Sequence, residues 1–263
     1  MWNRTEDQIE LYLIRHGMTA GNAMHRYIGG RTDEPLSEEG RQQLENKKNW
    51  LPGSGSFPQK IQTQKESGYE KSGITSESIC NSDSFSGIFV SPMLRCRQTA
   101  EILFPNQSQI EIDAWREMDF GAFEGKNYQE LNGDPRYQAW IDSGGTLAFP
   151  GGESREEFIA RCVEGMELVM EYLRSQFVGQ SCIECGREKD YQKEMKYSNK
   201  PIAADGVQQS TLKFAAVVHG GTIMALLSHY CGGDYFSYQV KNGEGYHLCL
   251  HLQENKMELK EKL

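Results

Sequence analysis

The sequence predicts an α/β fold in which a mainly parallel central sheet is covered by helices on both faces. Short runs of consecutive apolar residues recur at 11–14, 87–91 and 212–218, which is typical of strands buried on both sides. Segments with helical composition separate these runs along the chain. Alternation of strand and helix is the pattern of a parallel sheet with crossover helices.

The first strand, at 11–14, leads into a stretch rich in Gly, Asn, Arg and Thr that we interpret as a long functional loop, residues 17–34. Ser37 is expected to cap a helix that runs to about Leu51 and ends at the Pro-Gly pair that follows. The second strand, 87–91, runs into Pro92, a residue that favours a helix start.

The middle of the chain has weaker patterns. A helix is predicted at 93–103, a third strand at 109–113 and a glycine-rich irregular loop at 115–125. Asp134 and Pro135 stand in the order expected for a cap and first residue of a helix that ends near Ser143.

The clearest helix follows the capping box Ser154-Arg-Glu-Glu157. Apolar side chains then recur on one helical face at Phe158, Cys162, Met166, Val169, Leu173 and Phe177. A buried strand is expected at 212–218 and a helix at 222–230. Residues 246–252 and 257–263 can pair as a hairpin at the sheet edge, with 253–256 as its turn.

We expect residues 1–263 to form a single domain with polar insertions at about 53–86 and 179–209. The second insertion contains Cys182 and Cys185, which have the spacing of half a zinc site, but no second pair follows at metal spacing.

A net charge of −9 argues against nucleic acids and anionic membrane surfaces as partners. The seven cysteines are an odd number, and the N-terminal residues carry no secretory pattern, so we expect reduced thiols and a cytoplasmic location. Whether the chain forms a homo-oligomer stays open.

Three predicted strand ends carry basic groups. Arg15 and His16 follow the first strand, Arg95 lies in the first turn of the helix after the second, and His219 follows the strand at 212–218. Ligands of open α/β sheets bind at the carboxyl ends of the strands, and guanidinium groups match phosphate oxygens. The pattern therefore indicates a phosphate site at this edge.

The sequence resembles the histidine phosphatase superfamily, in the branch that contains phosphoglycerate mutases and small-molecule phosphatases. The matching motifs are Leu-Ile-Arg-His16-Gly-Met-Thr19-Ala-Gly-Asn22, the stretch 29–40, Ser-Pro-Met-Leu-Arg95-Cys-Arg-Gln-Thr-Ala, Arg-Glu117-Met-Asp-Phe-Gly-Ala-Phe-Glu-Gly, Phe-Pro-Gly-Gly-Glu-Ser154 and Val-Val-His219-Gly220-Gly-Thr. The resemblance implies the three-layer sandwich of phosphoglycerate mutases, with helices on both faces of the sheet.

The same resemblance implies which residues form the catalytic site and what each of them does. His16 would receive the phosphoryl group, Arg15, Arg95 and His219 would hold its oxygens, and Glu117 would protonate the leaving oxygen, without a metal or another cofactor. Among the carboxylates of this loop, Asp119 and Glu124 remain rivals of Glu117 on sequence grounds. Substrate contacts are expected at Thr19, Asn22, Gly29 and Gly220, although a loop that simply turns on Gly and Asn explains Asn22 and Gly29 nearly as well.

The expected partner is a small phosphorylated metabolite, and departures from the family pattern favour hydrolysis over mutase chemistry. Phosphoglycerate mutases carry Trp before the Asn of the first motif, where this chain has Gly21. The loop around Glu117 and the Phe-Pro-Gly-Gly-Glu-Ser motif are similar to those of bacterial α-ribazole phosphatases of cobalamin assembly. The alternatives are a mutase-type phosphoryl transferase and a non-catalytic module that binds a phosphorylated ligand.

Overall fold

The computed structural model of the protein describes residues 8–48, 85–177, 195–197 and 212–263. Within them, seven strands form one sheet in the order β4-β3-β2-β5-β1-β6-β7. Apart from 85–86 and 195–197, the two predicted insertions lie outside the described residues, as do Cys182 and Cys185.

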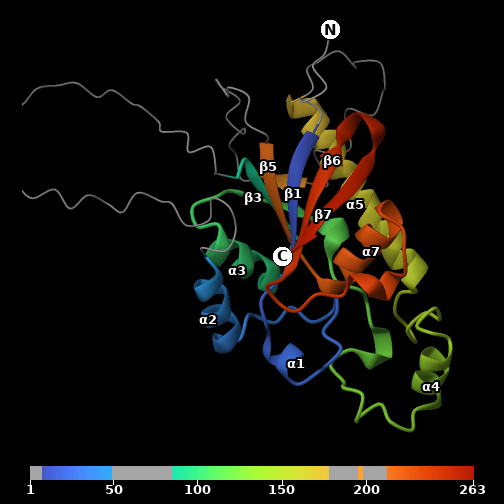
Figure 1. Ribbon diagram of the computed structural model, residues 1–263. Helices are drawn as coiled ribbons and strands as arrows, with labels where there is room; N and C mark the ends of the chain where they lie inside the picture. The colour runs from blue at the N-terminus through green and yellow to red at the C-terminus, as the bar shows by residue number, and fades with distance from the viewer. Residues whose placement is uncertain (1–7, 49–84, 178–194, 198–211) are drawn as a thin grey trace, which may run out of the picture.

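The centre of the sheet is parallel, as predicted. It consists of β1 (Gln8–Arg15), β5 (Leu212–Val218), β2 (Gly87–Val90) and β3 (Gln109–Ile112). All four strands end at the lower edge of the sheet in Figure 1, since parallel strands share one direction. This edge is where the sequence predicts the phosphate site.

Antiparallel strands flank this centre. The edge strands are β4 (Met195–Tyr197), β6 (Gly245–His251) and β7 (Lys256–Lys262). The predicted C-terminal hairpin is confirmed as β6 and β7, and Asn255 turns the chain between them with a left-handed φ of 52°. Strand β4 was not expected, because it is three residues long and lies in a polar stretch.

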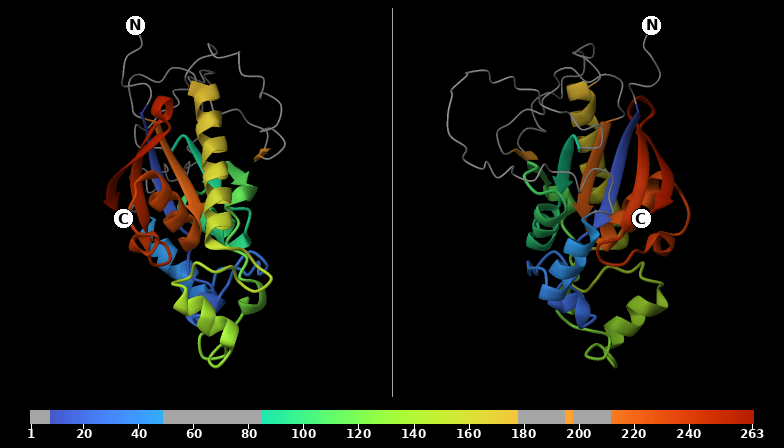
Figure 2. Two further views of the ribbon diagram at one scale, coloured as in Figure 1. Left: turned by 90° about the vertical axis from the view of Figure 1, so that its right-hand side faces the viewer. Right: turned by 60° about the vertical axis from the view of Figure 1, so that its left-hand side comes forward.

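Helices cover both faces of the sheet (Figures 1 and 2). The helices α2 (Glu38–Lys47) and α3 (Leu94–Leu103) pack on one face, and α5 (Arg155–Phe177) and α7 (Gly220–Tyr230) on the other. The capping box predicted for α5 is present: the Ser154 amide donates to Glu157 and the Glu157 amide donates to the Ser154 hydroxyl. Helix α7 begins at Gly220, two residues before the predicted start.

Strand β1 shows why the two layers form. Leu11 and Leu13 face the apolar cluster under α5 and α7, whereas Tyr12 and Ile14 face the cluster under α2 and α3. All four are at most 3% exposed. Successive side chains of a strand point to opposite faces, so a strand covered on both sides needs consecutive apolar residues.

Short elements surround the carboxyl edge of the sheet. They are α1 (Ala20–Ala23), α4 (Pro135–Asp142) and the 3₁₀ turns η1 (Asp113–Trp115), η2 (Gly121–Phe123) and η3 (Tyr235–Tyr238). The turn η4 (Leu252–Glu254) lies at the opposite edge, between β6 and β7. Helix α4 was predicted, and Asp134 caps it by accepting the Arg136 amide at 2.9 Å. Helix α1 was not predicted, because a single turn has no hydrophobic periodicity.

Candidate active site

Strand β1 delivers Arg15 and His16 to the carboxyl edge of the sheet. The His16 side chain is buried, and its Nδ1 lies 2.7 Å from the carbonyl oxygen of Gly17. A carbonyl oxygen only accepts, so Nδ1 carries the proton and Nε2 keeps a free lone pair. The Gly17 amide donates to Thr99 on α3 at 2.9 Å, and Arg15 Nη1 donates to the Val240 carbonyl at 2.7 Å.

Helix α3 delivers a fully buried guanidinium, that of Arg95. Its Nη1 and Nη2 donate to the carbonyl oxygens of Thr32 and Gly29, at 2.8 and 3.3 Å. The buried Nε atoms of Arg95 and Arg15 have no hydrogen-bond partner within the described residues, where neither guanidinium forms an ion pair with a carboxylate. Buried cations are normally paired, so this arrangement favours an anionic ligand.

His219 follows β5 and is the N-cap residue of α7. Its fully buried ring lies 5.2 Å from the His16 ring, centroid to centroid. Gly220 leaves room for Arg15, because a Cβ there would make a tight contact of 3.3 Å with Arg15 Nε. The first amides of α7 add positive potential at the same point.

Glu117 approaches the two imidazoles from the loop after η1. One oxygen, Oε1, accepts the Met118 amide at 3.0 Å, and Oε2 lies 3.9 Å from His219 Nδ1. Gly221 makes room for this carboxyl, because a Cβ there would stand 2.5 Å from Oε1. The Glu117 side chain is only 11% exposed.

A half-buried ion pair holds the loop that carries Glu117. Arg161 on α5 donates to the carbonyl oxygens of Ala114 and Arg116, at 2.8 and 3.0 Å. Glu153 fixes the same guanidinium at 2.8 Å. The backbone on the N-terminal side of Glu117 is therefore anchored to the longest helix described.

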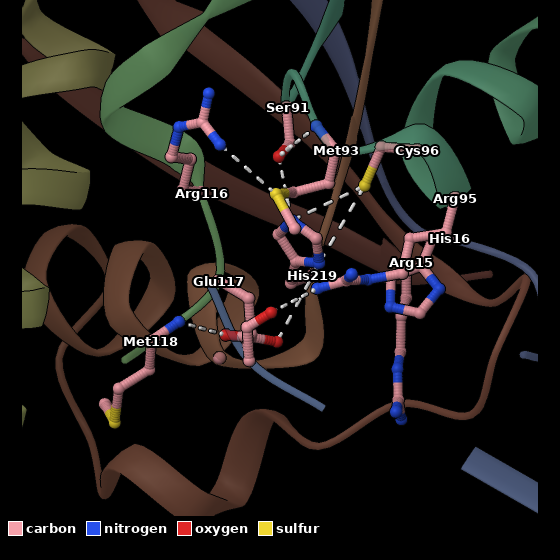
Figure 3. A network of polar contacts seen from close by, with 12 residues as sticks. Arg15, His16, Ser91, Met93, Arg95, Cys96, Arg116, Glu117, Met118 and His219 are labelled. Atoms are coloured by element: carbon pink, nitrogen blue, oxygen red, sulfur yellow. Dashed lines mark hydrogen bonds and ion pairs between the residues drawn. The ribbon is translucent and has the colours of Figure 1, made fainter. Parts of the chain in front are cut away.

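Burial and the two guanidiniums set the protonation states of the site. Burial, followed by the charges of Arg95 and Arg15, holds the pKa of both His16 and His219 well below the usual range, so both rings are neutral at pH 7. Burial raises the pKa of Glu117, against the opposing pull of the Met118 amide and the two arginines. Figure 3 shows these side chains together.

The structure separates Glu117 from the two rival carboxylates. Asp119 forms a surface ion pair with Arg31 at 2.7 Å. Glu124 accepts the amide of Gly29 at 2.9 Å and thereby supports the loop around that glycine. Of the three carboxylates, Glu117 is the one that lies beside the His219 ring.

The four residues that were expected to contact the substrate have different roles in the structure. Thr19 and Asn22 form the capping box of α1, in which each side chain accepts the amide of the other residue. Gly29 contributes a carbonyl oxygen to Arg95. Gly220 lies against Arg15 at the start of α7. Thus Gly29 and Gly220 shape the arginine positions directly, and Thr19 and Asn22 shape the loop that follows His16.

Sequence reasoning missed three residues of the site. The Ser91 hydroxyl lies 2.8 Å from His219 Nε2, and the Cys96 thiol lies 3.6 Å from the same atom. Asn242 donates to the carbonyl oxygen of His16 at 3.1 Å from a loop before β6. For Ser91 a signal existed, since it directly follows β2 just as His16 and His219 follow their strands.

Neither a metal cluster nor a membrane-spanning helix is found in the described part of the chain. Among its residues, no three His, Cys, Asp or Glu side chains are grouped so that they could hold a metal ion. None of its helices combines the length and apolar character that a membrane crossing requires.

A model of the histidine phosphatase superfamily (branch 1) matches residues 11–57 and 65–178 of the chain. The match ends before β5, so the position of His219 comes from the structure alone. No curated protein matches the sequence.

Several solved structures share the fold. One, described provisionally as an alpha-ribazole-5'-P phosphatase from Escherichia coli K-12, has a TM-score of 0.64 and 18% identity, covering 96% of this chain and 94% of that one. The alpha-ribazole phosphatase from Shigella flexneri has a TM-score of 0.61 and 18% identity, covering 96% and 95%. A phosphoglycerate mutase from Thermus thermophilus has a TM-score of 0.54 and 23% identity, covering 97% and 98%.

These identities are too low to transfer a substrate, and they establish the fold alone. The family model, in contrast, covers more than half of the chain and includes the segments that carry His16, Arg95 and Glu117. The protein belongs to branch 1 of the histidine phosphatase superfamily.

Proposed function

We propose that the protein is a phosphomonoesterase that transfers the phosphoryl group of a small metabolite to His16 and then to water. The observation that carries this proposal is a neutral imidazole whose free Nε2 lies beside the buried guanidinium of Arg95 and the partly buried one of Arg15, neither of which has a carboxylate partner in the described residues. Such a site supplies both a nucleophile and the positive charge that a phosphate dianion requires.

In the first step, the Nε2 lone pair of His16 forms a bond to phosphorus while the bond from phosphorus to the ester oxygen breaks. The Glu117 carboxyl gives its proton to that oxygen, so the product leaves as an alcohol. A neutral His16 is required here, and burial keeps it neutral. The raised pKa of Glu117 increases the protonated fraction of that acid near neutral pH.

In the second step, water attacks phosphorus and the bond to His16 Nε2 breaks. Glu117 is now a carboxylate and accepts one proton of the attacking water, which restores both groups and releases inorganic phosphate. Throughout both steps Arg15 and Arg95 hold the phosphoryl oxygens, whose charge is spread over the equatorial positions in the transition state. This charge compensation is why we expect no metal requirement.

For the substrate, we propose α-ribazole 5'-phosphate as the leading candidate, and with it a role in cobalamin assembly. Support comes from the sequence around Glu117 and from the fold shared with proteins described as α-ribazole phosphatases. The fold shared with a phosphoglycerate mutase supports the alternative, a phosphoryl transferase that returns the group to a second position of its product.

One experiment distinguishes these activities. The purified protein is incubated with α-ribazole 5'-phosphate, 3-phosphoglycerate and p-nitrophenyl phosphate, and released phosphate and isomerised product are measured separately. Release of phosphate that disappears in His16→Ala supports the phosphatase. Isomerisation of phosphoglycerate without phosphate release would favour the mutase, and tight phosphate binding without turnover of any ester would favour a binding module.

We also propose a cytoplasmic location and one domain for the whole chain. The four cysteines of the described residues, Cys96, Cys162, Cys231 and Cys249, are free thiols, which a reducing compartment preserves. Cell fractionation tests the location, and a single cooperative unfolding transition of the full chain tests the domain organisation.

A further inference from the structure

The side of the His219 ring that faces away from Glu117 is enclosed by groups whose proton positions can be worked out. Its Nε2 lies 2.8 Å from the hydroxyl oxygen of Ser91, and both residues are fully buried. The Met93 amide points to the same hydroxyl oxygen at 3.4 Å. The thiol of Cys96 lies 3.6 Å from Nε2 and 3.8 Å from Nδ1 (Figure 3).

The direction of the hydrogen bond between Ser91 and His219 follows from which partners can donate. The Met93 amide is a donor only. Burial raises the pKa of Cys96 to about 12, so its sulfur keeps its proton, and the thiol contacts the two ring nitrogens of His219. The amide occupies one lone pair of the Ser91 oxygen, and the hydroxyl proton needs an acceptor.

Two acceptors lie near that hydroxyl proton in the described structure, the Nε2 lone pair of His219 and the sulfur of Cys96. Sulfur accepts weakly, whereas an imidazole nitrogen is a good acceptor, and the 2.8 Å separation suits a strong bond. If His219 Nε2 instead donated its proton to Ser91, the Cys96 sulfur would be the remaining acceptor near the Ser91 hydroxyl proton within the described residues. When Glu117 is ionised, the reverse direction would also set the bare Nδ1 lone pair against a carboxylate oxygen 3.9 Å away.

We infer that Ser91 is a positioning residue that holds His219 in the tautomer with its proton on Nδ1. This inference rests on the proposed function for its catalytic meaning, but not for the proton position itself. The Nδ1 proton points toward the Glu117 side of the site, where it can donate to a bound phosphoryl oxygen.

The tautomer has a second consequence for the general acid. A ring that already carries a proton on Nδ1 and accepts one at Nε2 has no free lone pair to offer Glu117. His219 therefore cannot take the proton that Glu117 must give to the leaving group. Burial, followed by the charges of the nearby arginines, lowers the pKa of His219 and so disfavours a second proton on the ring. Among the described groups, the Glu117 carboxyl at 3.9 Å faces the ring from the other side.

The test compares the wild type with Ser91→Ala, Ser91→Thr and the control Ser228→Ala. Ser228 lies on α7, where its hydroxyl only bonds the Ala225 carbonyl of its own helix, so its removal should leave the site intact. Nitrogen-15 spectra of the histidine rings, with His219 assigned by a His219→Gln variant, give the tautomer directly. Steady-state kinetics with p-nitrophenyl phosphate and the affinity for inorganic phosphate are measured on the same samples.

We expect a protonated Nδ1 and an unprotonated Nε2 in wild-type His219, and a mixture of both tautomers in Ser91→Ala. The variant should lose kcat by up to roughly 10²–10³-fold, the usual effect of one preorganised donor, and the pH at which its rate falls on the alkaline side should move. Ser91→Thr keeps the hydroxyl and should retain the wild-type tautomer, and Ser228→Ala should match the wild type.

A proton on Nε2 in the wild-type spectrum would overturn the inference, and this measurement does not depend on any Ser91 variant folding well. Unchanged tautomer and kcat in a folded Ser91→Ala would overturn it too. If the tautomer behaves as expected but the wild type hydrolyses no phosphate ester, the proposed function fails while the role of Ser91 in fixing His219 stands.

Discussion

Replacement of Glu117 by Gln separates its role as an acid from its role in the structure. Gln has nearly the same size and keeps an oxygen that can accept the Met118 amide, a bond of 3.0 Å in the wild type. The Gln amide does not act as an acid near neutral pH, so it cannot protonate the leaving oxygen. The variant should therefore fold normally and lose turnover.

The size of the loss depends on the leaving group. A positioned general acid typically contributes ~10²–10⁴-fold, or about 3–5 kcal/mol, when the departing oxygen is strongly basic. An alkyl phosphate should show this full loss in Glu117→Gln. A p-nitrophenyl phosphate should lose far less, because its phenolate departs without protonation. The ratio of the two rates is the diagnostic quantity, since it cancels any general damage to phosphate binding.

The same substitution has a predictable effect on stability. Burial raises the pKa of Glu117 above its unfolded value, so the folded state binds more protons than the unfolded state between these two pKa values. Wild-type stability therefore falls as pH rises through that window and stays lower above it. Glu117→Gln should remove this dependence and melt at a higher temperature than the wild type at neutral pH.

The assay measures kcat/KM for both esters between pH 4 and 9, about the range in which carboxyl and imidazole groups titrate. The matched control is Asp119→Asn, which neutralises a neighbouring carboxylate whose partner is the exposed Arg31. The control should change either rate by less than about tenfold, since surface ion pairs contribute ~0–1 kcal/mol. Equal losses for alkyl and aryl esters in Glu117→Gln, or a larger effect in Asp119→Asn, would refute the assignment.

Three further predictions concern phosphate binding, metal dependence and the segment 54–84. Inorganic phosphate at ~100 times its Kd should stabilise the wild type by about 2.7 kcal/mol and raise its melting temperature. Arg95→Met should abolish this rise in melting temperature. A full rise in the variant would speak against Arg95 as a phosphate ligand. Prolonged treatment with a chelator should leave turnover unchanged, and a loss restored by added metal would contradict the role given to the arginines. Deletion of residues 54–84 should leave a chain that unfolds cooperatively, because the deletion spares Phe85, which is buried in the core. Loss of the cooperative transition would count against the interpretation of this segment as an insertion.

Much of the fold is predictable because its strongest signals are local. The apolar run of β1, the capping box of α5 and the apolar face behind it each depend on residues close together in sequence. The convergence of His16, Arg95 and His219 is also accessible, since parallel strands bring their carboxyl ends to one edge. The polar strand β4 and the single turn α1 lack such signals and were missed.

The finer structure of the site is not accessible from local patterns. Ser91 and His219 are 128 positions apart, and their hydrogen bond depends on how β2 and β5 pair. Asn242 reaches the His16 carbonyl from a loop 226 positions later in the chain. The choice among Glu117, Asp119 and Glu124 likewise depends on which partners the folded loop provides, since all three are carboxylates within one short segment.

The central claim is that His16 carries the phosphoryl group during turnover. It is tested by mixing the protein with a phosphate ester, stopping the reaction with alkali within one turnover, and locating the added phosphoryl group by mass spectrometry. We predict an acid-labile, alkali-stable phosphoryl group on the peptide that contains His16, absent from His16→Ala. Turnover in the wild type with the group on another residue, or continued hydrolysis by His16→Ala, would contradict the account.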